Sequence, residues 1–223
     1  MTSLPIRDPL TDHLLTPQNA ALLLIDYQPP QVNTIMSMDR PQLVNNVVTL
    51  AKIAKAYGLP IVLTTVNVSN GVNPDTIPQL RAVLPGVTAI DRTSINSWED
   101  GEFVAAVEAT GRKKLIMAAL WTEACLTFPT LDALRAGYEV YPVADAVGGI
   151  SREAHKMALR RVAQAGATLV SWNQVLCELQ RDWARKATVP AFVAISKEQG
   201  GTFGIQLTFD EDRQQQQQRP KAA

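Results

Sequence analysis

The chain alternates short apolar runs with longer segments of helical periodicity, and it does so six times. The apolar runs are rich in Leu, Ile, Val and Ala, which is typical of strands buried on both faces of a parallel sheet. These runs cover residues 20–26, 61–66, 87–90, 115–120, 138–145 and 167–171. Apolar spacing and stop signals predict helices at residues 40–57, 74–84, 98–111, 126–136, 151–165 and 174–186. The pattern therefore predicts an α/β fold, a three-layer Rossmann-like sandwich with a six-stranded parallel sheet and helices on both faces.

Two of the prolines, Pro142 and Pro129, limit what can be said of the elements that contain them. Pro142 is in the fifth apolar run and cannot donate a ladder hydrogen bond, so the length of that strand is left open. Pro129 is tolerated in the first turn of a helix and disruptive further in. The helix that follows Cys125 therefore either begins after that cysteine or is kinked.

A single domain accounts for the 223 residues, because this length suits one hydrophobic core. The core is predicted at residues 18–186. Residues 1–17 contain three prolines and are predicted to form an N-terminal arm. Residues 187–209 are predicted to form a C-terminal arm, and the charged, Gln-rich residues 210–223 a disordered tail.

Composition argues against several classes of partner. The chain has 21 Lys and Arg residues and 21 Asp and Glu residues, so it has no net positive charge that would favour binding to nucleic acid or to an anionic membrane. No apolar run approaches the roughly 20 residues of a membrane span, and the N-terminus has no secretion-signal pattern. Two cysteines do not make a disulfide framework. We therefore expect a cytoplasmic protein whose partner is a small molecule.

Cys125 lies where the fourth apolar run passes through a short polar turn into a helix. Backbone N–H groups and the positive end of a helix favour a thiolate, and in such positions they lower the thiol pKa from ~8.5 to roughly 3.5–7.5. This placement predicts a nucleophile, against the alternative of a buried structural thiol. Cys177 has the structural interpretation, because it lies inside the apolar helical run 175–179.

The base that activates Cys125 is predicted to be a carboxylate. The two histidines, His13 and His155, lie in the N-terminal segment and on a predicted helix, away from the predicted strand ends. Asp26 follows the first strand, which should neighbour the fourth, and ligands bind at the carboxyl ends of such strands. The alternative role for Asp26 is a helix cap or an ion-pair partner of Arg92.

Three motifs resemble those of the isochorismatase-like cysteine hydrolases, and of their YcaC-like subgroup in particular. LLLIDYQ at residues 22–28 resembles the opening motif of the family, and LWTEAC at residues 120–125 resembles its nucleophile motif. RTSINSW at residues 92–98 falls where the family has a basic residue followed by a Ser-Ala-Phe-like turn. The order and spacing of the motifs match over residues 15–185.

The resemblance implies a catalytic triad. Asp26 would be the general base, Cys125 the nucleophile, and Arg92 would stand where the family has lysine. Arginine stays charged, so it can stabilise negative charge but cannot transfer a proton as an amine can, and whether it supports full catalysis is left open. The resemblance also implies a cis peptide bond between Leu120 and Trp121, which aims the N–H groups of Trp121 and Cys125 at an oxyanion.

The resemblance also bears on metals and cofactors. Nicotinamidases of the family carry an Asp-x-His metal motif after the second strand, and the matching loop here, residues 67–73, has no histidine. We therefore predict that the reaction uses no metal and no other cofactor.

Four further residues, at or after predicted strand ends, are expected to line a substrate pocket. They are Gln28, Asn96, Trp98 and Trp172. The alternative for each tryptophan is core or interface packing. The resemblance implies a homo-oligomer, which is often an octamer in the YcaC-like subgroup.

The sequence thus predicts a cysteine-dependent hydrolase that cleaves an amide or related C–N or acyl bond of a small molecule through a thioester. It does not identify the substrate. The alternative is a non-catalytic or small-molecule-binding oligomer on the same scaffold, which Arg92 in place of lysine favours. Redox sensing through Cys125 is weaker, because the chain has no CxxC motif and Cys177 is predicted to be buried.

Overall fold

The computed structural model describes residues 7–218, which divide into two compact units. The first unit runs to Leu179 and holds all five strands of the sheet, and the second begins at Gln180 and holds two helices. In the described part of the chain, no helix combines the length and the apolar character needed to cross a membrane.

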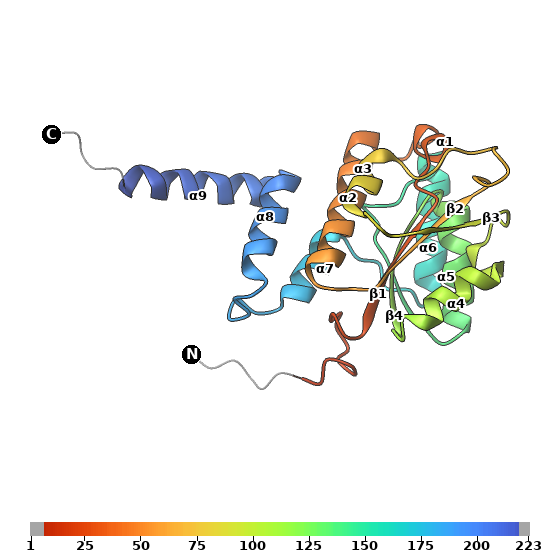
Figure 1. Ribbon diagram of the computed structural model, residues 1–223, viewed down its shortest axis with the longest axis horizontal. Coiled ribbons are helices and arrows are strands. Elements are labelled where there is room, and N and C mark those ends of the chain that lie inside the picture. The colour runs from red at the N-terminus through yellow and green to blue at the C-terminus, as the bar shows by residue number, and fades with distance from the viewer. Residues whose placement is uncertain (1–6, 219–223) are drawn as a thin grey trace. The chain divides into compact units, whose positions relative to one another are not determined.

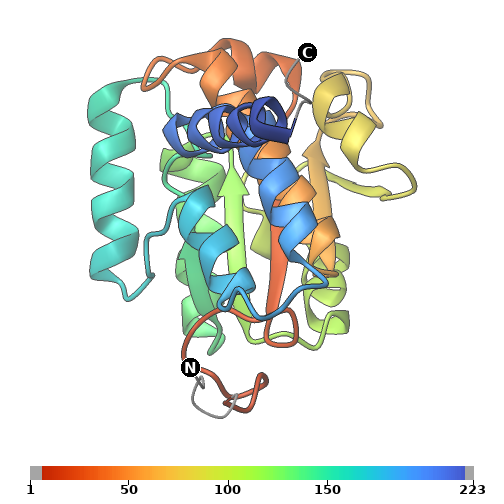
Figure 2. The same ribbon diagram turned by 90° about the vertical axis from the view of Figure 1, so that its left-hand side faces the viewer.

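A parallel sheet forms the centre of the first unit, in the strand order β3-β2-β1-β4-β5. The strands are β1 (Ala20–Ile25), β2 (Ile61–Val66), β3 (Ala89–Arg92), β4 (Lys114–Ala119) and β5 (Glu139–Pro142). They run in the same direction, as Figure 2 shows. β1 and β4 are buried along their whole length and lie side by side. The predicted pairing of the first and fourth strands is therefore confirmed.

Helices cover both faces of this sheet (Figure 1). On one face lie α2 (Arg40–Ala56) and α7 (Trp172–Gln180), and on the other lie α4 (Gly101–Ala109), α5 (Thr127–Arg135) and α6 (Arg152–Gln164). Short helices α1 (Pro29–Asn33) and α3 (Pro78–Val83) and a 3-10 turn η1 (Ser97–Glu99) occupy the connections. The predicted α/β architecture is confirmed.

Helix α2 shows how the local sequence sets these elements. The Asp39 side chain caps its first turn by accepting from the Gln42 N–H. Leu43, Val47 and Leu50 recur at spacings of three and four and are all buried. The helix ends before Gly58, whose φ of 68° lies in the left-handed region that glycine tolerates.

The sheet has five strands, so the prediction of a six-stranded sheet is wrong. Residues 167–171 do run beside β5, with the Thr168 N–H donating to the Val140 carbonyl at 2.9 Å and the Val170 N–H to the Pro142 carbonyl at 3.0 Å. Pro142 faces this segment and has no N–H to donate back, so the ladder is interrupted. The segment is left with a single isolated bridge, between Val143 and Val170.

The second unit contains α8 (Val189–Gln199) and α9 (Thr202–Gln218). Gly200 ends α8 in a left-handed conformation, and Gly204 packs so close to α8 that a Cβ would lie 2.0 Å from the Ser196 carbonyl oxygen. The structure thus differs from the predicted disordered tail, because α9 continues through residues 210–218. Within this stretch Arg213 pairs with Asp210 and Gln216 with Asp212, at the spacings of three and four that bring side chains together on a helix. Residues 1–6 of the predicted N-terminal arm and residues 219–223 of the tail lie outside the described residues.

Asp91 of β3 holds the loop that follows β2. Its carboxylate accepts from the backbone N–H groups of Val68 (3.0 Å) and Ser69 (2.8 Å) and from the hydroxyls of Ser69 and Thr65. Burial acts to raise the pKa of Asp91, but these hydrogen bonds outweigh it and lower the pKa to about 2. The loop at residues 67–73 is therefore anchored at the carboxyl edge of the sheet.

We expect Asp91→Asn to lower the free energy of unfolding at neutral pH by about 1 kcal/mol, because the amide N–H₂ would face N–H donors. A depressed carboxylate pKa stabilises the fold above the unfolded pKa of about 4 and loses that effect as the pH falls toward about 2. The stability gap between wild type and variant should therefore narrow below about pH 4 in urea titrations. A gap that stays constant with pH would contradict this role for Asp91.

Candidate active site

Asp26, Arg92 and Cys125 come from three segments that end at the carboxyl edge of the sheet. Asp26 follows β1, Arg92 is the last residue of β3, and Cys125 lies in the turn after β4. β2 separates β1 from β3, so the Arg92 side chain must cross it. On the way its Nη1 donates to the carbonyl oxygen of Thr65 in β2, at 3.0 Å.

Arg92 and Asp26 form a bidentate ion pair in the interior. Arg92 Nη1 donates to Asp26 Oδ1 and Nη2 to Oδ2, each at 2.8 Å, and both side chains are fully buried. Burial acts to lower the pKa of Arg92, but the hydrogen bonds and charge of Asp26 outweigh it and raise the pKa. The buried Nε–H of Arg92 has no hydrogen-bond partner among residues 7–218. The structure therefore shows the ion pair with Arg92 that was given above as the alternative role of Asp26, and its role as a general base stays a prediction.

Asp26 itself has a left-handed backbone, with φ at 60°. Its N–H still continues the sheet by donating to the Thr64 carbonyl at 3.1 Å, and its own carbonyl accepts from the Gln28 N–H at 2.8 Å. Few residues other than glycine adopt this conformation, and aspartate is among those that do so more readily. The chain thus turns sharply at the residue that carries the carboxylate.

Residues 120–126, which carry the predicted nucleophile Cys125 and are therefore called the nucleophile turn, connect β4 to α5. The turn begins with a cis peptide bond at Leu120–Trp121, where the family resemblance implies one. One π-helical turn follows, in which the Leu126 N–H donates to the Trp121 carbonyl at 3.2 Å. The regular helix begins at Thr127, which places Pro129 in its first turn. Of the two alternatives for Pro129, the structure has the helix beginning after Cys125.

Cys125 is 8% exposed as a residue, and its thiol lies within hydrogen-bonding reach of the Asp26 carboxylate and the Trp121 backbone N–H. Burial raises the pKa of Cys125 most, and the charge of Asp26 and its hydrogen bond raise it further. The Trp121 N–H and the Arg92 charge act in the opposite direction but do not outweigh them. The predicted lowering of the thiol pKa is therefore wrong for this resting site, in which the thiol keeps its proton beside a carboxylate.

Two of the expected pocket residues are occupied by structural hydrogen bonds. Gln28 is fully buried; its amide nitrogen donates to the carbonyls of Val66 and Pro74, and its amide oxygen accepts from the Val66 N–H. Asn96 caps η1 through the Trp98 N–H and donates to Asp132 at 2.7 Å. These side chains hold the loops around the site in place.

The two expected pocket tryptophans differ in their surroundings. The Trp98 ring packs edge-to-face on Phe103 (6.2 Å between centroids) and Tyr138 (5.5 Å), so it has the packing role given above as the alternative. Trp172 begins α7 and is half-buried, and its backbone N–H donates to Asp145 at 2.9 Å. A pocket role for Trp172 stays a prediction.

The surroundings of Cys177 and His155 differ from those expected from the sequence. Cys177 is exposed, so the prediction of a core cysteine is wrong; it lies on the outer side of α7, whose buried apolar residues are Val175, Leu176 and Leu179. His155 is half-buried, and its Nδ1 lies 2.9 Å from the Thr122 hydroxyl in the nucleophile turn. A single sequence offers no signal for this contact, because Thr122 and His155 come from different elements and only the packing of α6 brings them together.

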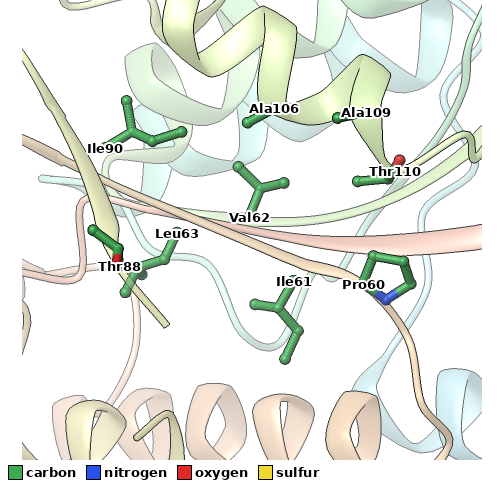
Figure 3. A pocket seen from close by; sticks show the side chains of 9 residues that line it. All are labelled: Pro60, Ile61, Val62, Leu63, Thr88, Ile90, Ala106, Ala109 and Thr110. Atoms are coloured by element: carbon green, nitrogen blue, oxygen red, sulfur yellow. The ribbon is translucent and has the colours of Figure 1, made fainter. Parts of the chain in front are cut away.

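A hollow of about 360 Å³ lies between α4 and the sheet (Figure 3). Ile61 and Val62 of β2 line it together with Ala106 and Ala109 of α4. It exists because β3 is short and pairs with β2 only from Leu63 onward. None of the candidate site residues lines it, so it is separate from the candidate active site.

The expected absence of a metal rests on the sequence of residues 67–73, which contain no histidine. Within the described ranges, no group of three or more His, Cys, Asp or Glu side chains is placed to hold a metal ion. Metal independence stays a prediction.

Comparison with known proteins identifies similar chains. The Isochorismatase domain family model matches residues 20–174. The probable hydrolase YcaC of Escherichia coli (strain K12) is 40% identical over 170 residues, which cover 76% of this chain and 81% of that protein. The solved structure of Escherichia coli YcaC, described as an octameric hydrolase of unknown specificity, has a TM-score of 0.84 at 34% identity and covers 90% of this chain and 98% of its own. YcaC from Pseudomonas aeruginosa, solved with hexane-2,5-diol and covalent acrylamide, also has a TM-score of 0.84, at 35% identity, with the same coverage.

We expect Asp26→Asn to lower the free energy of unfolding by about 3–5 kcal/mol, because it leaves the Arg92 guanidinium charged and uncompensated in the interior. Urea denaturation at neutral pH measures the loss. The matched control is Asp75→Asn, which breaks the ion pair between Arg81 and the half-exposed Asp75 and should cost at most about 1 kcal/mol. Equal losses for the two variants would contradict the importance of the buried pair.

Proposed function

From the premise that the chain belongs to the isochorismatase family, we propose that it is a cysteine-dependent hydrolase of a small-molecule amide or a related C–N or acyl bond. The observation that carries the proposal is the placement of the Cys125 thiol against the buried Asp26–Arg92 pair. This arrangement supplies a nucleophile, a base for its proton and a fixed positive charge within one buried site.

In the first step, Cys125 attacks the carbonyl carbon of the substrate while its proton passes to Asp26. Because burial and the Asp26 charge hold the proton on sulfur at rest, proton transfer accompanies formation of the S–C bond. The carbonyl π electrons move to oxygen. Protonation of Asp26 removes the negative charge that balanced Arg92, so the guanidinium then compensates the new oxyanion. The total charge of the site does not change.

In the second step, the protonated Asp26 gives its proton to the leaving nitrogen as the C–N bond breaks, which leaves a thioester on Cys125. Water then attacks the thioester and gives a proton to Asp26. The tetrahedral intermediate collapses, the C–S bond breaks and the proton returns to the thiol. The net reaction consumes one water molecule and releases an acid and an amine.

The backbone N–H groups of Trp121 and Cys125 are the proposed oxyanion donors. The Trp121 N–H lies near enough to the Cys125 sulfur to lower the pKa of the thiol, and the carbonyl oxygen of a bound substrate would lie beside that sulfur. Trp121 is fixed at its other end, because its indole Nε1–H donates to the Thr34 hydroxyl at 2.8 Å. Preorganised donors of this kind need no reorganisation when the charge develops.

Arg92 in place of lysine is compatible with this mechanism, because no step needs the cation to transfer a proton. Its planar guanidinium donates one hydrogen bond to each oxygen of Asp26, whereas the ammonium group of lysine does not match both oxygens as well.

The relatives offer further support. The acrylamide in the Pseudomonas aeruginosa YcaC structure is covalently bound, and acrylamide is an electrophile that reacts with thiolates. We extend the octameric assembly of Escherichia coli YcaC to this chain, and we propose a cytoplasmic setting for it.

A non-catalytic protein that binds a small molecule is the second candidate. The raised pKa of the Cys125 thiol favours it, because an unactivated thiol is a weak nucleophile. Turnover that depends on Cys125 separates the two candidates.

We expect Cys125→Ala to lower turnover at least about 10³-fold on any amide, nitrile or ester that the wild type hydrolyses, because the nucleophile is lost. Mass spectrometry of the rapidly quenched wild type should show the mass of an acyl-enzyme on the peptide that contains Cys125. The matched control is Cys177→Ala, which removes the exposed thiol and should retain wild-type turnover. Undiminished turnover by Cys125→Ala would disprove the proposed mechanism.

We expect Arg92→Lys to lower kcat by about 10-fold, because it keeps the charge but loses the planar guanidinium, and Arg92→Met to lower kcat by about 10³-fold. Steady-state kinetics measure both, with thermal unfolding to show that each variant is folded. A folded Arg92→Met variant with wild-type kcat would refute the role of the cation.

A further inference from the structure

Thr122 is fully buried near the start of the nucleophile turn and is held by three hydrogen bonds. Its N–H donates to the Gly148 carbonyl at 2.9 Å, and its carbonyl accepts from the Thr127 hydroxyl at 2.7 Å. The third hydrogen bond joins its own hydroxyl to Nδ1 of His155, at 2.9 Å. His155 is the only one of these partners that can change its charge near neutral pH.

Gly149 packs closely against the side chains of both His155 and Glu123. A Cβ added at Gly149 would lie 3.2 Å from the His155 Cβ and 2.4 Å from Glu123 Oε2, so the backbone of Gly149 separates the two side chains closely. Glu123 Oε1 accepts from the Ile150 N–H at 3.0 Å. Segment 148–155 therefore forms one side of the nucleophile turn, and His155 lies where it touches Thr122.

The environment of His155 keeps its ring neutral. Burial lowers its pKa, and the negative charge of Glu123 raises it by less, so the pKa of His155 lies below the ordinary value of ~6.5. A neutral ring whose Nδ1 carries no proton accepts the hydrogen of the Thr122 hydroxyl. Elsewhere in residues 7–218 this hydroxyl has no hydrogen-bond partner.

We propose that His155 is a positioning residue for the nucleophile. Its neutral imidazole accepts a hydrogen bond from the Thr122 hydroxyl, and this bond holds helix α6 against the turn that presents the Cys125 thiol to Asp26. The inference rests on the proposed function in taking Cys125 as the nucleophile. It assigns His155 a role through Thr122, without contact with substrate. A Cys-His dyad is not part of it, because Nδ1 bonds the threonine hydroxyl.

Protonation of His155 would break the hydrogen bond that its Nδ1 accepts from the Thr122 hydroxyl. A charged ring carries hydrogens on both nitrogens, so it can donate to Thr122 but can no longer accept from it. The buried hydroxyl hydrogen would then lose its acceptor, and the turn would loosen around Cys125. Charged groups on the packed elements are Glu123 of the turn, Asp132 and Arg135 of α5, and Arg152, Glu153, Lys156, Arg160 and Arg161 of α6 itself. Glu123 is the one whose charge acts on the pKa of His155.

Alkylation of Cys125 by iodoacetamide, followed by mass spectrometry across a pH series, tests the proposal without any substrate. A thiol reacts as its thiolate, so the logarithm of the rate rises with a slope of about one per pH unit below the thiol pKa. If His155 must be neutral, the slope for Cys125 steepens to about two below the His155 pKa. The exposed Cys177 gives the internal reference, with a slope of about one throughout.

Three variants sharpen this test. His155→Asn puts an amide oxygen where Nδ1 lies, so the rate at neutral pH should stay within about threefold of wild type and the slope should stay at about one. His155→Gln carries its amide one bond further out and should lower the rate about 10-fold at all pH values. Glu123→Gln removes the charge that raises the pKa of His155 and should move the steep region to lower pH.

A wild-type slope of one over the whole pH range would overturn the proposal. So would a steep region that persists in His155→Asn, or a His155→Gln rate equal to that of wild type. Thermal unfolding of each variant shows whether it is folded. If Cys125→Ala retains turnover while these alkylation results hold, the proposed function fails, and His155 positions the Cys125 thiol without a role in turnover.

Discussion

The buried ion pair between Arg92 and Asp26 is the interaction on which the rest of the site depends. Two charges without solvent exposure are tolerable only when their geometry is good, and the two hydrogen bonds of 2.8 Å meet that condition. To make them, Arg92 must cross β2 from the end of β3, and Asp26 must turn back in a left-handed conformation after β1. The sheet register, the anchored loop after β2 and the turn at Asp26 all serve this arrangement.

The nucleophile turn is built around this pair from several directions. The turn follows β4, which lies beside β1, and α5 begins directly after it. Segment 148–155 packs against the turn through hydrogen bonds of Gly148 and His155 with Thr122. The thiol consequently meets a carboxylate and a backbone N–H in an interior where both interactions are strong. In the proposed mechanism, the burial that raises the resting pKa of Cys125 makes proton transfer to Asp26 part of the attack, and that transfer frees the Arg92 charge to compensate the oxyanion.

Much of the fold could be predicted from local pattern. Segment 61–66 was predicted with the bounds that β2 has, and α2 differs by one residue. The predictions failed where a non-local contact decided the outcome. The sixth segment does lie beside β5, but the missing N–H of Pro142 interrupts its ladder. Cys177 lies in an apolar run, yet it points away from the buried face of its helix. Residues 210–218 have the composition of a tail and form the last part of α9.

The sequence by itself determined the alternation of strands and helices, the strand ends that carry Asp26, Arg92 and Cys125, and the family. These follow from periodicity and from motifs, which are properties of neighbours along the chain. Only the tertiary structure decided which polar side chains are free for chemistry. It ties Gln28 and Asn96 into loops, joins Asp26 to Arg92 across 66 residues and Thr122 to His155 across 33, and surrounds the Cys125 thiol so that its pKa rises. The physical reason is that burial and hydrogen bonding depend on which distant segments pack together, and a single sequence does not record that packing.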